Sequence, residues 1–167
     1  IVDLPFGVTL KIAGTGDESY VRSLKDKVAA LGLEKNVEWL GWKDREEKYV
    51  ELMRSDCFVL TSHNENFANV VIESLHVGTP VVISEHVGLA PFVREKNLGW
   101  VTSLDRGSIR KSIIDAYNEK AKRDFVNESG RKIIDDSFGQ PVLIDQYVQN
   151  YFRLKSNKVP EGVQAYM

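Results

Sequence analysis

Residues 65–83 read ENFANVVIESLHVGTPVVI, a helix pattern followed directly by a strand pattern. The first part is rich in apolar side chains and has Asn66, a favourable N-cap residue, near its start. Gly78 and Pro80 typically end a helix, the glycine in a left-handed cap and the proline just past it. The run that begins at Pro80 is apolar on both faces, as in a parallel strand that helices cover on both sides. We therefore predict a buried helix from near Phe67, followed by a buried strand.

The same alternation extends in both directions from this segment. Four more short apolar or β-branched runs are typical of strands, at residues 8–13, 37–40, 57–60 and 99–101. Apolar residues at helical spacing lie between them, namely Tyr20, Leu24, Val28 and Leu31 in one interval and Tyr49, Leu52 and Met53 in the next. Strands that alternate with helices indicate right-handed βαβ units. The predicted fold is α/β and Rossmann-like, a doubly wound parallel sheet of about five strands with helices on both faces.

Other patterns mark boundaries along the chain. Asp44 and Glu47 have the spacing of a capping box at the start of the second helix. No strand pattern occurs in residues 105–153, so a helical carboxy-terminal segment is predicted, with a break at 137–141. Residues 156–167 are expected to form a loose tail. The chain opens almost directly into a strand, which suggests that something upstream is absent.

Composition excludes several functional classes. The 167 residues carry 22 basic and 24 acidic side chains, a formal net charge of -2, so the basic surface of a nucleic-acid-binding domain is lacking. No signal peptide and no apolar span of about 20 residues is present. The single cysteine, Cys57, excludes an internal disulfide and is typical of a reducing compartment. We expect one cytoplasmic domain with no nucleic-acid partner and no membrane segment.

Two carboxylates, Glu65 and Glu73, flank the start of the predicted helix. Ligands of open α/β sheets bind at the carboxyl ends of strands, and free N–H groups at a helix start suit phosphate. Eight helical residues would separate the glutamates by about 12 Å along the axis and about 80° around it. Carboxylates that cleave one glycosidic bond lie about 5–9.5 Å apart, so this pair is too distant for that task. The spacing suits a long ligand with sugar, diphosphate and ribose parts.

Each of these features also has a structural interpretation. Glu73 could be a solvated helix residue, but its apolar neighbours make burial costly unless the carboxylate is paired or faces a ligand. The pair Gly14 and Gly16 fits a plain tight turn as well as a nucleotide-binding one. No cluster of His, Asp or Glu has metal-ligand spacing, and no G-x-S-x-G elbow supports a serine triad.

The three histidines are weak candidates for functional residues. His63 and His86 are expected at strand ends, where a loop residue without a role is commoner than a ligand contact. His76, inside the predicted helix, is expected to be a hydrogen-bonded core residue.

Several motifs occur in the order found in one enzyme family. They are Gly14-Thr15-Gly16, Leu40-Gly41-Trp42, Glu65-x7-Glu73, Gly78-Thr79-Pro80-Val81-Val82, Val87-Gly88-Leu89 and Leu98-Gly99-Trp100-Val101. Across residues 8–153 the chain resembles the carboxy-terminal, donor-binding domain of the family-4 retaining glycosyltransferases, which have the B-type fold. The glutamate pair with Gly-Thr-Pro-Val behind it is the specific part of this resemblance.

The resemblance implies a role for each candidate residue. Glu65 would act in catalysis, facing the donor sugar near the reacting carbon, and Glu73 would hold the nucleotide ribose. The diphosphate would bind the backbone amides of Phe67, Ala68, Asn69 and Val70. The turn of Gly14 and Gly16 and the loop of Trp42 and Lys43, which borders the base, would complete the donor site. Two residues depart from the family pattern: Ala68 replaces a glycine, and Pro91 replaces an acidic residue.

The resemblance also implies that parts of the enzyme lie outside this sequence. The family's Arg and Lys that neutralise the diphosphate have no counterpart here, and Lys11 and Lys43 are no obvious substitutes. Residues 1–155 would be a nucleotide-sugar-binding domain without its first strand and most of its first helix. The amino-terminal, acceptor-binding domain would be absent, so we expect this chain alone to be inactive.

The implied reaction moves a sugar from a nucleoside diphosphate sugar to a glycan, lipid or other acceptor, without a metal or other cofactor, as in polysaccharide biosynthesis. The implied partners are the nucleotide-sugar donor and, through the absent domain, a sugar or lipid-linked acceptor. The full-length protein would be cytoplasmic or peripheral at the inner membrane face. Two alternatives stay open: half of a sugar-nucleotide epimerase, and a catalytically silent nucleotide-binding module.

Overall fold

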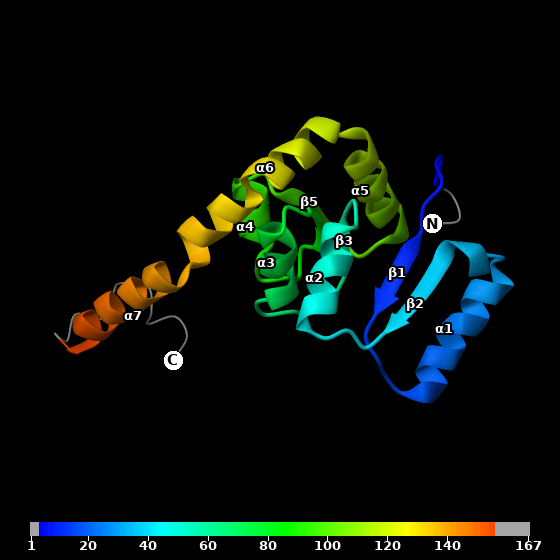
Figure 1. The fold of residues 1–167 in the computed structure, drawn as a ribbon, viewed down its shortest axis with the longest axis horizontal. Coiled ribbons are helices and arrows are strands. Elements are labelled where there is room, and N and C mark those ends of the chain that lie inside the picture. Colours follow the sequence, from blue (N-terminus) through cyan, green and yellow to red (C-terminus); the bar gives the residue numbers. More distant parts are fainter. Residues whose placement is uncertain (1–3, 156–167) are drawn as a thin grey trace.

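The computed structural model describes residues 4–155 of the chain, in which strands and helices alternate up to Thr102 and helices follow (Figure 1). The elements are β1 (Leu10–Ala13), α1 (Glu18–Ala30), the short 3-10 helix η1 (Glu34–Asn36), β2 (Val37–Gly41), α2 (Arg45–Met53), β3 (Phe58–Leu60), α3 (Asn69–His76), β4 (Val81–Ser84), α4 (Ala90–Glu95), β5 (Gly99–Thr102), α5 (Arg106–Asn118), α6 (Lys120–Phe138) and α7 (Gln140–Lys155). Each predicted strand is present. The tail expected at 156–167 lies outside the described residues.

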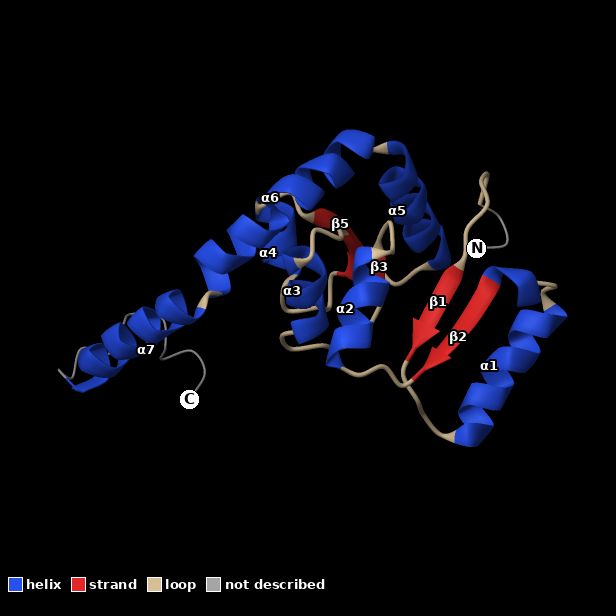
Figure 2. Ribbon diagram, viewed as in Figure 1, coloured by secondary structure: helices blue, strands red, loops and turns tan. Residues whose placement is uncertain are grey.

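The five strands form two parallel sheets, where the sequence predicts one. β1 pairs with β2, and β3, β4 and β5 pair in that order. Figure 2 shows β1 and β2 beside α1 on one side of the molecule, and the second sheet among the helices from α2 to α6. Among residues 4–155, β1 and β3 therefore each have a hydrogen-bonded neighbour strand on one edge only. The α/β class and the parallel pairing are confirmed, whereas the predicted continuity of the sheet is wrong.

The hydrophobic core lies around the second sheet. All four residues of β4 are buried, and Leu75 of α3 and Val126 of α6 pack into the same cluster with no exposed surface. α6 approaches α3 closely because residue 130 is glycine: a Cβ on Gly130 would lie 2.5 Å from the carbonyl oxygen of Leu75. The apolar run after Pro80 thus forms the doubly covered strand that its composition predicts.

The first sheet is poorly covered by comparison. Val37 is the one buried residue in the range 10–41. The predicted apolar stripe of α1 is present, but none of its residues is buried, and Tyr20 exposes 62% of its surface. A stacked ring pair, Phe6 and Tyr117, joins the segment before β1 to α5, with ring centroids 3.7 Å apart.

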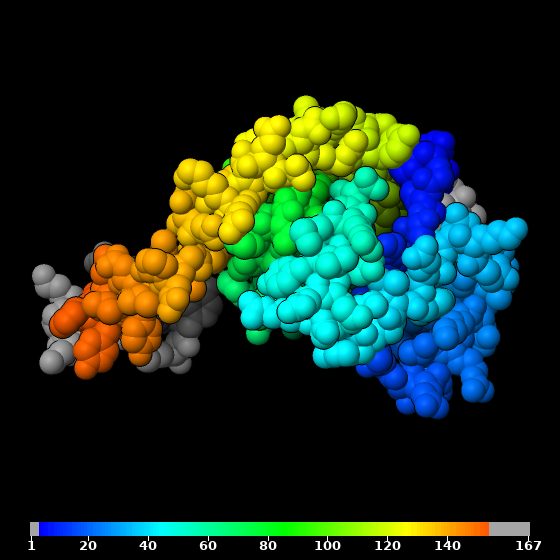
Figure 3. Space-filling model, in the orientation of Figure 1, coloured from blue at the N-terminus to red at the C-terminus, as the bar shows by residue number. Residues whose placement is uncertain are grey.

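Most helix ends follow the sequence prediction. Asp44 and Glu47 form the capping box at the start of α2. Gly78 has a φ of +86° and follows the end of α3, as expected of a glycine cap. α6 and α7 are separated at Gly139, inside the predicted break, and Figure 3 shows α7 extending away from the rest of the molecule. Within residues 4–155, no helix is both long enough and apolar enough to cross a membrane.

Candidate functional site

Glu65 lies in the loop between β3 and α3, at the carboxyl end of the second sheet. Its carbonyl oxygen accepts a hydrogen bond from the N–H of Gly88 at 2.8 Å, and its own N–H donates to the carbonyl oxygen of His86 at 3.3 Å. Glycine is needed at this contact, because a Cβ on Gly88 would lie 1.8 Å from the carbonyl oxygen of Asn66. The loop after β4 thus holds Glu65 at the strand ends, where ligands of α/β sheets bind.

α3 begins at Asn69, two residues later than predicted. Ala68 occupies the N-cap position in the left-handed conformation, with φ +58° and ψ +69° and no side-chain cap, so the prediction of Asn66 as N-cap is wrong. The left-handed region favours glycine, the residue that the family resemblance implies at position 68. The N–H groups of Asn69 and Val70 have no carbonyl partner inside the helix and are able to bind an anion.

The late start of α3 changes the relation between Glu65 and Glu73. Glu65 is paired with Val87 in an isolated parallel bridge and is not helical. The helical part of the interval runs from Asn69 to Glu73 and rises about 6 Å. The predicted rise of about 12 Å through eight helical residues is therefore wrong. In chain order, the two glutamates still flank the first turn of α3.

Glu73 is paired with Lys48, which α2 contributes. The Lys48 Nζ atom lies 2.7 Å from both carboxylate oxygens of Glu73 and donates a hydrogen bond to Oε1. Oε2 is buried and accepts no well-aligned hydrogen bond from the described residues. The ion pair meets the condition expected for a carboxylate in an apolar helix. Lys48 could not be predicted as the partner, because residue order does not show which side chain of α2 faces α3.

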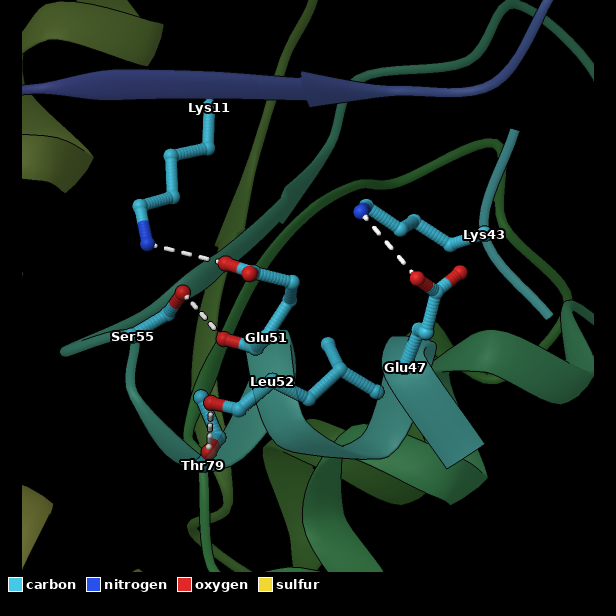
Figure 4. Close-up of polar contacts among 7 residues, drawn as sticks. All are labelled: Lys11, Lys43, Glu47, Glu51, Leu52, Ser55 and Thr79. Carbon is cyan, nitrogen blue, oxygen red and sulfur yellow. Dashed lines mark hydrogen bonds and ion pairs between the residues drawn. The ribbon is translucent and has the colours of Figure 1, made fainter. Parts of the chain in front are cut away.

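The turns after β1 and β2 lie together. The N–H of Gly14 donates to the carbonyl oxygen of Gly41 at 2.8 Å, and both glycines have positive φ angles, +120° and +65°. Trp42 exposes 75% of its surface, and the Lys43 Nζ atom lies 3.6 Å from Oε1 of Glu47 (Figure 4). The structure thus brings the turn that contains Gly14 and Gly16 next to the loop that contains Trp42 and Lys43.

Figure 4 also shows how α2 is fixed between the two sheets. Lys11 of β1 forms an ion pair with Glu51 of α2 at 2.8 Å. The hydroxyl of Thr79, which precedes β4, donates to the carbonyl oxygen of Leu52 at 2.7 Å. α2 is therefore tied to the first sheet through a charge pair and to the second through a buried hydrogen bond.

Within residues 4–155, the side chains of the three histidines form no hydrogen bond or ion pair with the two glutamates of the candidate site. His63 and His86 are exposed. The Nε2 atom of His76 lies 3.2 Å from Asp135 of α6, and its side chain is 37% exposed, so His76 is a surface contact between helices and the predicted core position is wrong. In the described part of the chain, no three His, Cys, Asp or Glu side chains gather as metal ligands.

Cys57 packs against Val82, Trp100 and Ala116, and burial raises the pKa of its thiol to about 12. At pH 8 the thiol is therefore protonated, and only the thiolate is a good nucleophile. We expect the native protein to react with the disulfide reagent DTNB about 10³-fold more slowly than the unfolded chain, and the rate to rise as the pH approaches 12. Equal rates with and without denaturant at pH 8 would contradict this burial.

Two hollows in the surface lie away from the glutamates. One of about 410 Å³ lies between β5 and α5, with Trp100, Ser108 and Lys111 among its lining residues. The other, of about 460 Å³, lies along the start of α1 and includes Asp17 and Arg22. Neither lining contains Glu65 or Glu73. The candidate site is therefore defined by its side chains and backbone amides at the strand ends.

Comparison with known proteins identifies the family. Residues 7–133 match the family described as glycosyl transferases group 1. The chain belongs to this family. The resemblance seen in the sequence is thus confirmed, and the strand-end loops described above fall inside the matched region of this glycosyltransferase domain.

Individual relatives agree with the family match. A lipopolysaccharide core biosynthesis glycosyltransferase of Rhizobium meliloti is 29% identical over 145 residues, which cover 86% of this chain and 41% of that protein. The crystal structure of Anabaena HepE in complex with UDP and glucose has a TM-score of 0.79 at 22% identity and covers 90% of this chain and 42% of that one. Sucrose-phosphate synthase from Thermosynechococcus elongatus has a TM-score of 0.79 at 24% identity, with 93% and 40% covered. The Rossmann-like, B-type fold is confirmed, and the chain spans about two fifths of these proteins.

Proposed function

We propose that this chain is the donor-binding part of a retaining glycosyltransferase, which moves a sugar from a nucleoside diphosphate sugar to a glycan, lipid or other acceptor. The observation that carries the proposal is the arrangement at the end of the second sheet. There Glu65 is fixed by the loop after β4, and the first turn of α3 leads from it to Glu73. Family membership supports the transfer reaction, and the UDP and glucose bound to HepE support a nucleotide sugar as donor.

Each part of the arrangement suits one part of such a donor. Positive charge develops on the sugar as the diphosphate leaves, and the Glu65 carboxylate would stabilise it in the transition state. The amides from Phe67 to Val70 and the start of α3 would bind the diphosphate. Glu73 would accept hydrogen bonds from the ribose, and the base would lie by the loop of Trp42. The proposal includes a metal-independent reaction and a cytoplasmic location.

Replacing Glu73 by glutamine is expected to weaken nucleotide binding. A hydrogen bond to a charged group contributes about 1.5–3 kcal/mol, so Glu73→Gln should raise the nucleoside diphosphate dissociation constant roughly ten- to a hundredfold. Isothermal titration measures this change. Glu51→Gln is the matched control, because Glu51 is also a partly exposed glutamate paired with a lysine, yet lies outside the proposed donor site. Equal dissociation constants for the wild type and Glu73→Gln would contradict the proposed binding of the ribose by Glu73.

We further propose that a strand from additional polypeptide joins the two sheets. A strand between β1 and β3 would give the order β2-β1-x-β3-β4-β5, that of doubly wound nucleotide-binding sheets. Leu10 and Val59 on the flanking strands expose 37% and 38% of their surfaces, which fits incomplete coverage. The match covers only 41% of the Rhizobium meliloti relative, which supports additional polypeptide as the origin of this strand.

Amide hydrogen exchange tests whether the edges of β1 and β3 that face the proposed strand are unpaired in this chain. In the 167-residue chain, the N–H groups on the unpaired edges of β1 and β3 should exchange quickly, and those of the buried strand β4 should be protected at least about 10³-fold more strongly. Protection of β1 and β3 equal to that of β4 would show that the two sheets are closed against each other.

Product analysis tests the proposed function itself. A polypeptide that carries this domain together with the acceptor-binding part would be incubated with labelled UDP-, GDP- and ADP-sugars and candidate acceptors. Transfer with retained anomeric configuration is the expected result, and the 167-residue chain alone should transfer nothing. Epimerisation of the donor without transfer would contradict the proposal, and transfer by the chain alone would contradict the division into two domains.

A further inference from the structure

The contact between α2 and α3 points to a residue that controls ribose recognition, an inference that rests on the proposed function. We propose that Lys48 is a positioning residue, which holds the Glu73 carboxylate in one orientation for the ribose hydroxyls of the donor. Lys48 itself need not touch the ligand. Its Nζ atom is 2.7 Å from both Glu73 oxygens, and the two side chains are 34% and 22% exposed.

The surroundings of Glu73 explain why it needs a cation. Its neighbours about one turn away along the chain are the apolar Val70 and Val77 and the polar Asn69 and His76. Burying part of a carboxylate is costly unless a cation or a hydrogen-bond donor lies close. Lys48 contacts both carboxylate oxygens and therefore fixes the plane of the group for two adjacent hydroxyl groups.

Glu73 also has accepting capacity left after it binds Lys48. An ionised carboxylate offers about four lone-pair sites, and one ammonium group fills only part of them. Oε2 is buried and accepts no well-aligned hydrogen bond from the described residues. Buried polar atoms normally have a hydrogen-bond partner, and the ion-pair contact with Lys48 at 2.7 Å takes that place for Oε2. The Glu73 side chain is 22% exposed, and a ligand hydroxyl would bind at that exposed part.

A second ion pair of α2 provides a matched control. Lys11 and Glu51 lie 2.8 Å apart, and their side chains are 31% and 24% exposed, close to the values for Lys48 and Glu73. Lys11→Met removes a pair of similar distance and burial that also ties α2 to a neighbouring element (Figure 4). It leaves Glu73 and Lys48 in place. A general loosening of α2 would therefore affect both lysine variants, and a ribose-specific effect only one.

The experiment compares a nucleotide with its counterpart that lacks the ribose hydroxyls. Dissociation constants are measured by ligand-observed NMR, which reaches weak binding, for the tightest of UDP, GDP and ADP and for its 2′,3′-dideoxy form. The ratio of the two constants reports the ribose contribution and cancels the attraction of any lysine for the diphosphate. The wild type should show a ratio of about 10–100. Lys48→Met should bring the ratio to within about threefold of one, whereas Lys48→Arg and Lys11→Met should keep most of it.

The outcomes separate this inference from the proposed function. A wild-type ratio near one, or no nucleotide binding at all, would overturn the ribose role of Glu73 and the inference with it. A high ratio that persists in Lys48→Met would overturn the inference alone. Equal loss in Lys48→Met and Lys11→Met would assign the effect to the packing of α2 and also overturn it. Thermal unfolding identifies a variant that does not fold, in which case Lys48→Gln replaces Lys48→Met and should likewise lower the ratio, because it removes the ammonium group that contacts both Glu73 oxygens.

Discussion

Glu65→Gln should lower the rate of sugar transfer about 10²- to 10³-fold, while the affinity for the free nucleoside diphosphate stays nearly unchanged. The carboxylate is expected to act on charge that develops on the sugar, and the free diphosphate has no sugar to contact. Steady-state kinetics of a polypeptide with the acceptor-binding part, beside titration with the nucleoside diphosphate, measure the two effects. The glutamine side chain has the same shape, so a change in packing is small.

The Glu65 and Glu73 substitutions serve as controls for each other. Glu73 is expected to contact the ground state and the transition state alike, so its loss should appear mainly in binding. The loss of the Glu65 carboxylate should mainly lower the rate of turnover. If Glu65→Gln abolished nucleotide binding and Glu73→Gln preserved it, the assignment of the two ends of the site would be reversed.

Gly88→Ala should destabilise the protein by about 3 kcal/mol and displace the Glu65 loop. A Cβ at this position would lie 1.8 Å from the carbonyl oxygen of Asn66, and the hydrogen bond from Gly88 to Glu65 leaves the backbone little room to move. Denaturant unfolding measures the loss of stability. Transfer by the longer polypeptide should fall as well, because Glu65 would no longer be held at the strand ends.

Gly7→Ala is the matched control, since a Cβ on Gly7 would have no atom within 4 Å. Its effect on stability should stay within about 0.5 kcal/mol. Equal stability of Gly88→Ala and Gly7→Ala would mean that the contact between the loops after β3 and β4 does not hold Glu65 in place.

The sequence predicts the elements of this fold well, because each rests on a local pattern. The run from Pro80 is apolar on both faces and forms the buried strand β4, and the Asp44–Glu47 spacing gives the capping box of α2. The start of α3 was predicted wrongly because Asn66 is a good cap by residue type, whereas the chain instead places Ala68 in a left-handed conformation that its side chain does not favour.

Features that depend on packing between distant segments could not be predicted. The split into two sheets depends on what lies between β1 and β3, which no local pattern reports. The same is true of Lys48, since its partner Glu73 is 25 residues away along the chain. The motif that contains Glu65 and Glu73 locates the candidate site, but only the structure shows that the loop after β4 holds one glutamate and α2 holds the other.

The proposed function requires that a nucleoside diphosphate binds at the ends of the strands, between Glu65 and Glu73. This binding is tested by titrating the ¹⁵N-labelled 167-residue chain with UDP, GDP and ADP and following its amide NMR signals. The largest shifts should occur at residues 65–73, with smaller ones at residues 14–16 and 41–43. Shifts concentrated instead around the hollow between β5 and α5, at Trp100, Ser108 and Lys111, would contradict it.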